Sequence, residues 1–178
     1  MKCAWPLLQK KGVMGLKDIE SIIDLYGDML YRICIVELQS EADAEDAVQE
    51  TFIKYFKKQP KTESGEHTKA WLIRTAVNCS RDIRRRNRVR EYEDIDLLCD
   101  RIASSDTASA DDGVVLRVLM SLPEKFSRVM VLHFLEDLDY RTIAGIIGRS
   151  ESAVKMRIKK GRELFISQYK KEMGINEK

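Results

Sequence analysis

Basic side chains cluster near the C-terminus, in a stretch that has the pattern of a helix-turn-helix. The apolar segment 140–147 is followed by Gly148, whose freedom to adopt a left-handed backbone permits a tight turn. Ser150 is a good N-cap for a second helix, and Glu151 suits the positive end of its dipole. Cationic and polar side chains at the start of such a helix can bond phosphates and base edges in the DNA major groove. The residues predicted to face outward, and therefore to bind duplex DNA, are Arg149, Ser150, Ser152, Ala153, Lys155, Met156, Arg157, Lys159 and Lys160.

A second basic block covers residues 69–90, with eight basic side chains and one acidic side chain. Trp71 and Asn78 come before a run of arginines on what we expect to be the same helix. An aromatic ring, an amide and guanidinium groups on one helix can stack on unpaired bases and bond to them. The candidates for binding melted DNA are Trp71, Arg74, Asn78, Arg81, Asp82, Arg84, Arg85 and Arg86.

The segment 43–52 is acidic, so it is a poor surface for DNA and fits a protein partner better. Charge alone also fits an ordinary solvated helix face. The candidates for protein binding are Asp43, Asp46, Gln49 and Glu50.

Charge is distributed unevenly in a chain of 178 residues whose net charge is only +2. Residues 16–60 sum to −5 and residues 91–113 to −7, whereas residues 69–90 and 140–171 each sum to +7. This asymmetry predicts two surfaces for nucleic acid in an otherwise acidic protein.

The elements that must position these residues are predicted to be all α-helical. Hydrophobic residues make up 44% of the chain, glycine and proline are sparse, and no long alternating strand pattern occurs. Helices are expected over about 16–38, 41–58 and 68–90, and Pro123 is expected at the first position of a later helix. We therefore expect a disordered extension over 1–15, a helical domain over 16–90, a flexible acidic linker over 91–113, and a helix-turn-helix domain over 114–172.

Other classes of site find little support. The four cysteines form no CxxC and only two histidines are present, so we expect no metal, no cofactor and no disulfide framework; a redox-sensing thiol is the less favoured alternative. No nucleophile–base constellation or glycine-rich phosphate loop is evident, which argues against an enzyme and a small-molecule substrate. No run of 18 apolar residues and no signal peptide are found, so membrane insertion is not expected.

Three stretches in this order resemble an extracytoplasmic-function (group IV) sigma factor of bacterial RNA polymerase. Residues 43–52 resemble that family's core-binding segment, and residues 71–86 resemble the segment for −10 recognition and melting. Residues 122–165 resemble its region 4. Ala153 stands where members often have threonine, and Met156 where a small residue is usual; these departures bear on promoter preference rather than on the class.

The resemblance implies a role for each set of residues. The acidic set would bind a coiled coil on core RNA polymerase, the set around Asn78 would contact the −10 element, and the helix-turn-helix set would read the −35 element. The loop 60–67 would help to form a pocket for a flipped base. The implied protein is a cytoplasmic initiation factor for stress or envelope-response genes, which an anti-sigma factor could hold at the inner membrane face.

The alternative is a stand-alone helix-turn-helix regulator, which would predict a dimer and a palindromic site. The linker, the second basic block and the lack of a dimer-forming heptad all argue against it.

Overall fold

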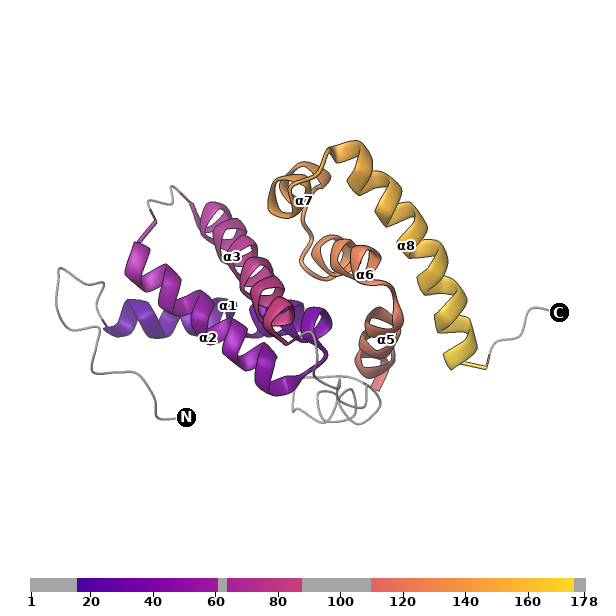
Figure 1. Ribbon diagram of the computed structural model, residues 1–178, viewed down its shortest axis with the longest axis horizontal. Helices are drawn as coiled ribbons and strands as arrows, with labels where there is room; N and C mark the ends of the chain where they lie inside the picture. Colours follow the sequence, from indigo (N-terminus) through magenta and orange to yellow (C-terminus); the bar gives the residue numbers. More distant parts are fainter. Residues whose placement is uncertain (1–15, 61–63, 88–109, 175–178) are drawn as a thin grey trace.

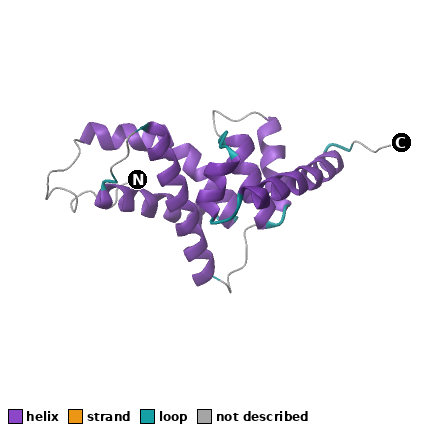
Figure 2. Ribbon diagram, turned by 90° about the horizontal axis from the view of Figure 1, so that it is seen from above, coloured by secondary structure: helices purple, strands orange, loops and turns teal. Residues whose placement is uncertain are grey.

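The computed structural model describes residues 16–60, 64–87 and 110–174, and their regular elements are helices (Figures 1 and 2). The expected extension over 1–15, most of the linker and part of the loop 60–67 lie outside the described residues. We call α1–α3 the first module and α5–α8 the second module. Their helices are α1 (Leu16–Leu38), α2 (Glu41–Lys58) and α3 (Gly65–Arg86), then α5 (Ala110–Ser121), α6 (Glu124–Met130), α7 (Tyr140–Ile147) and α8 (Glu151–Glu172).

The first module packs three helices around one apolar core. Leu30 and Ile33 of α1, Phe52 of α2, and Leu72 and Ala76 of α3 are buried together, as their spacing of three and four residues predicts. Ile23 of α1 lies outside this core, since its side chain is exposed. The three-helix core confirms the all-helical prediction and presents the outer faces of α2 and α3 to solvent.

Side-chain caps fix where α2 and α3 begin. The Ser40 hydroxyl accepts a hydrogen bond from the backbone N–H of Asp43 at 3.3 Å, as expected for an N-cap. Ser64 accepts from the N–H of His67 at 3.3 Å, and α3 therefore begins at Gly65, three residues earlier than predicted. The helix also ends earlier than predicted, at Arg86.

The second module departs from prediction at three places. Helix α5 begins at Ala110, inside the segment predicted as linker. Pro123 is the N-cap of α6 rather than its first helical residue. After Met130 the backbone widens into a π-helical segment, Val131–Leu135, which neither periodicity nor composition had indicated.

The two modules lie side by side, with α3 of the first facing α7 of the second and α1 facing α5 and α6 (Figure 1). Buried apolar residues of both modules belong to one continuous cluster. Among the described residues, no helix combines the length and the apolar character that crossing a membrane requires.

Candidate DNA and polymerase interface

The turn of the helix-turn-helix is built as the sequence predicts. Gly148 has a φ of 66° and caps α7 in the left-handed conformation. The Ser150 hydroxyl accepts a hydrogen bond from the N–H of Ala153 at 3.2 Å and caps α8. Asp139 caps the start of α7 by accepting from the N–H of Thr142 at 2.6 Å, and this bond lowers the pKa of the Asp139 carboxyl. Both helices of the motif therefore have defined starts.

The first three turns of α8 divide into a buried stripe and an outer face. Val154 and Ile158 are buried against the rest of the second module. Arg149, Ser150, Ser152, Lys155, Met156, Lys159 and Lys160 are exposed, whereas Ala153 and Arg157 are half-buried. Glu151 is the one acidic residue in the first two turns of this face. The predominance of cations suits the binding of DNA phosphates.

Met156 is the most unusual member of this face. Its side chain is 67% exposed although it is a large hydrophobic group surrounded by cations. An apolar side chain at the start of a helix that enters the major groove can contact the thymine methyl group.

The outer face of α3 carries the second basic set. Arg74, Asn78, Arg81, Asp82, Arg85 and Arg86 are exposed on it. Their links are local and weak: Arg81 Nη1 lies 3.4 Å from Asn78 Oδ1, and Arg85 pairs with Asp82 at 3.3 Å on the surface.

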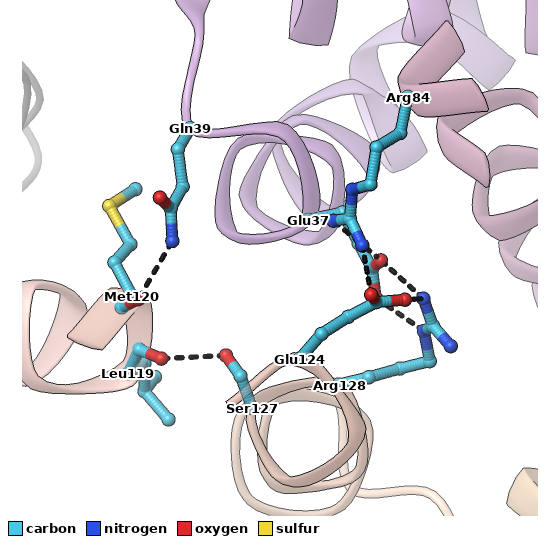
Figure 3. A network of polar contacts seen from close by, with 8 residues as sticks. All are labelled: Glu37, Gln39, Arg84, Leu119, Met120, Glu124, Ser127 and Arg128. Carbon is cyan, nitrogen blue, oxygen red and sulfur yellow. Dashed lines mark hydrogen bonds and ion pairs between the residues drawn. The ribbon is translucent and has the colours of Figure 1, made fainter. Parts of the chain in front are cut away.

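Trp71 and Arg84 are less accessible than the rest of the α3 set. The Trp71 ring is half-buried and packs edge-on against Tyr55, with the two centroids 5.6 Å apart. Arg84 is half-buried and its guanidinium faces the second module, where it pairs with Glu37 and Glu124 (Figure 3). Arg84 therefore lies apart from the solvent-facing arginines with which the sequence grouped it.

The acidic set lies on the outer face of α2. Asp46, Gln49 and Glu50 are exposed, and Glu50 forms a surface ion pair of 3.4 Å with Lys54. Asp43 is half-buried because its carboxylate accepts a hydrogen bond of 2.9 Å from Asn87 at the end of α3. Three side chains of this set are therefore accessible to a protein partner.

The structure brings some members of the two basic sets together. Arg81 of the α3 set and Arg149 and Arg157 of the helix-turn-helix set line one cavity of about 410 Å³ between the modules. Lys125 and Arg128 of α6 add two further cations to its wall.

The residues that hold the modules together were not predicted from the sequence. Glu37 is buried on α1 and accepts hydrogen bonds from Arg128 Nε and Nη2, each at 2.5 Å. The signal for it was available, because a single carboxylate interrupts the apolar run 33–38, and a buried charge requires a partner. No such signal identifies Arg128 or Arg84 as the partners of Glu37.

Comparison with known families agrees with this geometry. Sigma-70 region 2 matches residues 22–90, and Sigma-70 region 4 matches residues 113–165. The ECF RNA polymerase sigma factor SigW of Bacillus subtilis is 27% identical over 83% of this chain and 86% of its own length. The ECF sigma factor SigE of Mycolicibacterium smegmatis is 30% identical over 81% of this chain and 58% of its own.

Solved structures show the same fold. The sigma factor RpoE of Bartonella quintana, in complex with the anti-sigma factor NepR, superimposes with a TM-score of 0.66 at 22% identity, over 91% of this chain and all of that chain. CnrH in complex with the cytosolic domain of CnrY gives a TM-score of 0.62 at 21% identity, over 86% of this chain and 88% of that one. With two sigma-70 regions in order, the helix-turn-helix in the second and an acidic face in the first, this chain belongs to the extracytoplasmic-function sigma factors of bacterial RNA polymerase.

Proposed function

We propose that this chain binds core RNA polymerase through α2, reads the −35 element with α8, and contacts the −10 element with α3. The observation that carries this proposal is the separation of one acidic face and two basic faces onto three different helices. A protein that bound only duplex DNA would not need an exposed acidic helix, because the acidic side chains would repel the DNA phosphates.

The contacts on α8 and α3 suit two different forms of DNA. The α8 face has a capped helix start with exposed side chains, a geometry that fits the major groove of a duplex. The α3 face combines exposed arginines with Asn78 and the half-buried ring of Trp71, which suits bases that have left the stack. Linking the two modules in one chain raises the effective concentration of the second contact once the first has formed.

We further propose that the protein acts in the cytoplasm and is controlled by an anti-sigma factor. Of two structural neighbours, RpoE was solved in complex with the anti-sigma factor NepR, and CnrH in complex with the cytosolic domain of CnrY. A membrane-anchored partner of this kind would hold the factor at the inner face of the membrane until a signal releases it.

In vitro transcription tests the central proposal. Purified full-length chain is added to core polymerase on a library of promoter fragments, and the transcript starts are sequenced. We expect transcripts that depend on the chain and share two upstream elements. Transcription that is independent of the chain would refute the proposal.

A gel shift separates this function from that of a stand-alone regulator. A sigma factor should bind duplex promoter DNA weakly without core polymerase, since its acidic helix opposes binding and its α3 face needs melted DNA. Tight, sequence-specific binding to a duplex palindrome by a dimer of the free chain would favour the regulator instead.

A further inference from the structure

The cavity of about 410 Å³ beside the turn of the helix-turn-helix has a strongly cationic wall. Arg81 of α3 is the single contribution of the first module, and the rest of the lining comes from α6, the turn 147–149 and α8. One carboxylate, that of Glu124, lines it as well. The basic side chains in the lining, which we call the cation pocket, are Arg81, Lys125, Arg128, Arg149 and Arg157.

The carboxylate of Glu124 does not neutralise the cation pocket. Glu124 pairs with Arg128 and also with Arg84, which lies outside the lining (Figure 3). Its one negative charge is therefore shared between a cation of the pocket and a cation beyond it. Cations held around one cavity repel one another, so an anion that enters the cavity is stabilised by all of them.

Arg128 gives the cation pocket a fixed inner wall. Its side chain is only 9% exposed, and Glu37 accepts hydrogen bonds from its Nε and Nη2, each at 2.5 Å. These bonds hold the guanidinium in one orientation and leave Nη1 without a partner among the described residues. Figure 3 shows one guanidinium nitrogen of Arg128 directed away from both carboxylates. A guanidinium held in this way can donate its uncommitted edge to a phosphate oxygen.

The other four cations of the pocket form no ion pair with a described residue. Arg81, Lys125 and Arg149 are exposed, and Arg157 is half-buried. Arg81 Nη1 lies 3.4 Å from the amide oxygen of Asn78, and Lys125 Nζ lies 4.9 Å from the centre of the Phe126 ring. Neither contact cancels the charge. Arginine binds phosphate through two parallel hydrogen bonds and lysine binds it as a point charge, so both types suit a phosphorylated ligand.

The size and the lining of the cavity select a small anion with several charges. Cavities of roughly 300–1,000 Å³ hold small molecules, whereas a DNA duplex can only lie across such an opening. Ile147 is the one apolar side chain among the described residues that line the cavity, so charge contributes more than contact with a nucleobase. Because the cations come from four separate elements, they surround a ligand from several sides, which suits a chain of phosphates better than a single one.

We propose that the cation pocket is a binding site for a compact polyphosphate anion, either an inorganic polyphosphate or the phosphate chain of a nucleotide. The positive end of the α8 dipole lies at the same turn and favours the anion further. The site goes beyond the proposed function and does not depend on it, because the ligand binds the free protein. Lys125 and Arg128 have no assigned part in DNA recognition.

Isothermal titration calorimetry of the full-length chain with inorganic triphosphate tests the site, with ionic strength held constant. We expect saturable binding at one site. Lys125→Gln and Arg149→Gln each remove one cation and should raise the dissociation constant by about fivefold or more, because a charge-assisted hydrogen bond is lost. The matched controls are Lys57→Gln on α2 and Arg162→Gln on α8, which make the same changes at exposed positions outside the lining. Circular dichroism verifies that all four variants keep their helices.

The pattern across the variants decides the outcome. Weaker binding in the two pocket variants, with wild-type binding in both controls, supports the site. Equal weakening in all four variants would mean an adventitious ion only, attracted by net charge, and would overturn the proposal, as would the lack of saturable binding. Titration with ATP then identifies the source: tighter binding than triphosphate indicates a nucleotide, and equal binding indicates the phosphate chain alone.

A competition experiment separates this site from the proposed function, on which this arm alone rests. Arg149 and Arg157 are assigned both to the −35 duplex and to the cation pocket, so the two ligands should exclude each other. Fluorescence anisotropy of a labelled promoter duplex with the full-length chain should show displacement by triphosphate, and Lys125→Gln should require about fivefold more triphosphate.

The two failures are distinguishable. Calorimetric binding without displacement of DNA would support the pocket and contradict the DNA-binding roles of Arg149 and Arg157. A chain that starts transcription with core polymerase but binds no triphosphate would contradict the pocket alone.

Discussion

The side-chain amide of Asn87 donates a hydrogen bond of 2.9 Å to the carboxylate of Asp43, which ties the end of α3 to the first turn of α2. An acid proposed to bind polymerase is thereby positioned by the helix proposed to contact the −10 element. Asn87→Ala should lower the free energy of unfolding by about 0.5–1.5 kcal/mol, because one partly buried hydrogen bond is lost. Urea denaturation followed by circular dichroism measures this change. Unchanged stability would mean that the bond contributes nothing in solution.

Polymerase binding should depend on the exposed acids of α2. The double substitution Asp46→Lys, Glu50→Lys reverses two charges on that face and should weaken binding of core polymerase by tenfold or more, about 1.4 kcal/mol or more. The control is Asp24→Lys, Asp28→Lys, which makes the same reversal at exposed positions of α1. Surface plasmon resonance with immobilised core polymerase gives both affinities, and equal values for the two variants would show that α2 is not the contact.

Substitutions in α8 should affect promoter binding differently according to whether the side chain contacts a base or a phosphate. Arg157→Ala and Lys155→Ala should each cost about 1–3 kcal/mol wherever the side chain bonds a base, and relax the preference at that base pair. Lys159→Ala, farther along the helix, should instead weaken binding to all promoter sequences alike. It should also reduce by about 1 the slope of the logarithm of the binding constant against the logarithm of salt concentration. Holoenzyme binding to promoter variants at several salt concentrations separates the two patterns. A uniform effect of Arg157→Ala across all sequences would place this arginine on the phosphates.

Two glycine substitutions should have opposite effects on stability. Gly148 has a φ of 66°, a conformation that costs an alanine about 1–2 kcal/mol, so Gly148→Ala should destabilise the second module. Gly27 lies inside α1 with open space where a Cβ would stand, and Gly27→Ala should stabilise the protein by about 0.5–1 kcal/mol. Thermal melts of the two variants test the pair, and a shift of the same sign for both would contradict the backbone argument.

The pH dependence of stability should reveal the buried carboxyl of Glu136. Burial raises its pKa, and the nearby Arg32 only partly opposes this effect. A raised pKa means that the folded state binds the proton more tightly, so this contribution to stability is complete below the ordinary value of 4.5 and is lost as pH rises. Glu136→Gln should therefore match the wild type in acid and be more stable at neutral pH.

Asp139 provides the opposite case in the same experiment. Its pKa is lowered by the hydrogen bond from Thr142, so its contribution is present at neutral pH and is lost as pH falls. Asp139→Asn should therefore be less stable than the wild type at neutral pH and approach it in acid. Denaturation midpoints across the pH range measure the stability of both variants relative to the wild type. If this difference changed with pH in the same direction for both variants, the opposite pKa shifts assigned to Glu136 and Asp139 would be refuted.

The sequence predicted those parts of the fold that depend on local patterns. Apolar spacing located α1 and α2, the left-handed Gly148 and the Ser150 cap marked the turn, and the ordered acidic and basic stretches identified the family. Each of these signals lies within one helix or turn, so it can be detected without knowing the tertiary structure.

Features that depend on contacts between distant residues escaped prediction. Arg84 was grouped with its neighbours on α3 because charge alone cannot tell a solvent-facing arginine from one that meets Glu37 and Glu124. Glu37 and Arg128 are 91 residues apart in the sequence. They meet because the two modules pack together, and no local sequence pattern predicts this packing. The π-helical segment Val131–Leu135 lies in a nearly continuous apolar run, which has no period from which its wider turn could be predicted.

Helices α6 and α8 are in close contact at Gly161, where a Cβ would stand only 2.9 Å from Cγ of Met130. The lack of a side chain at Gly161 thus sets the distance between the two helices. This distance in turn determines the orientation of α8, the recognition helix, relative to α6. Among relatives, positions 130 and 161 should therefore change as a pair: a larger residue at 161 requires a smaller one at 130. A relative with bulk at both positions would have to tilt its recognition helix and would approach the DNA groove at a different angle.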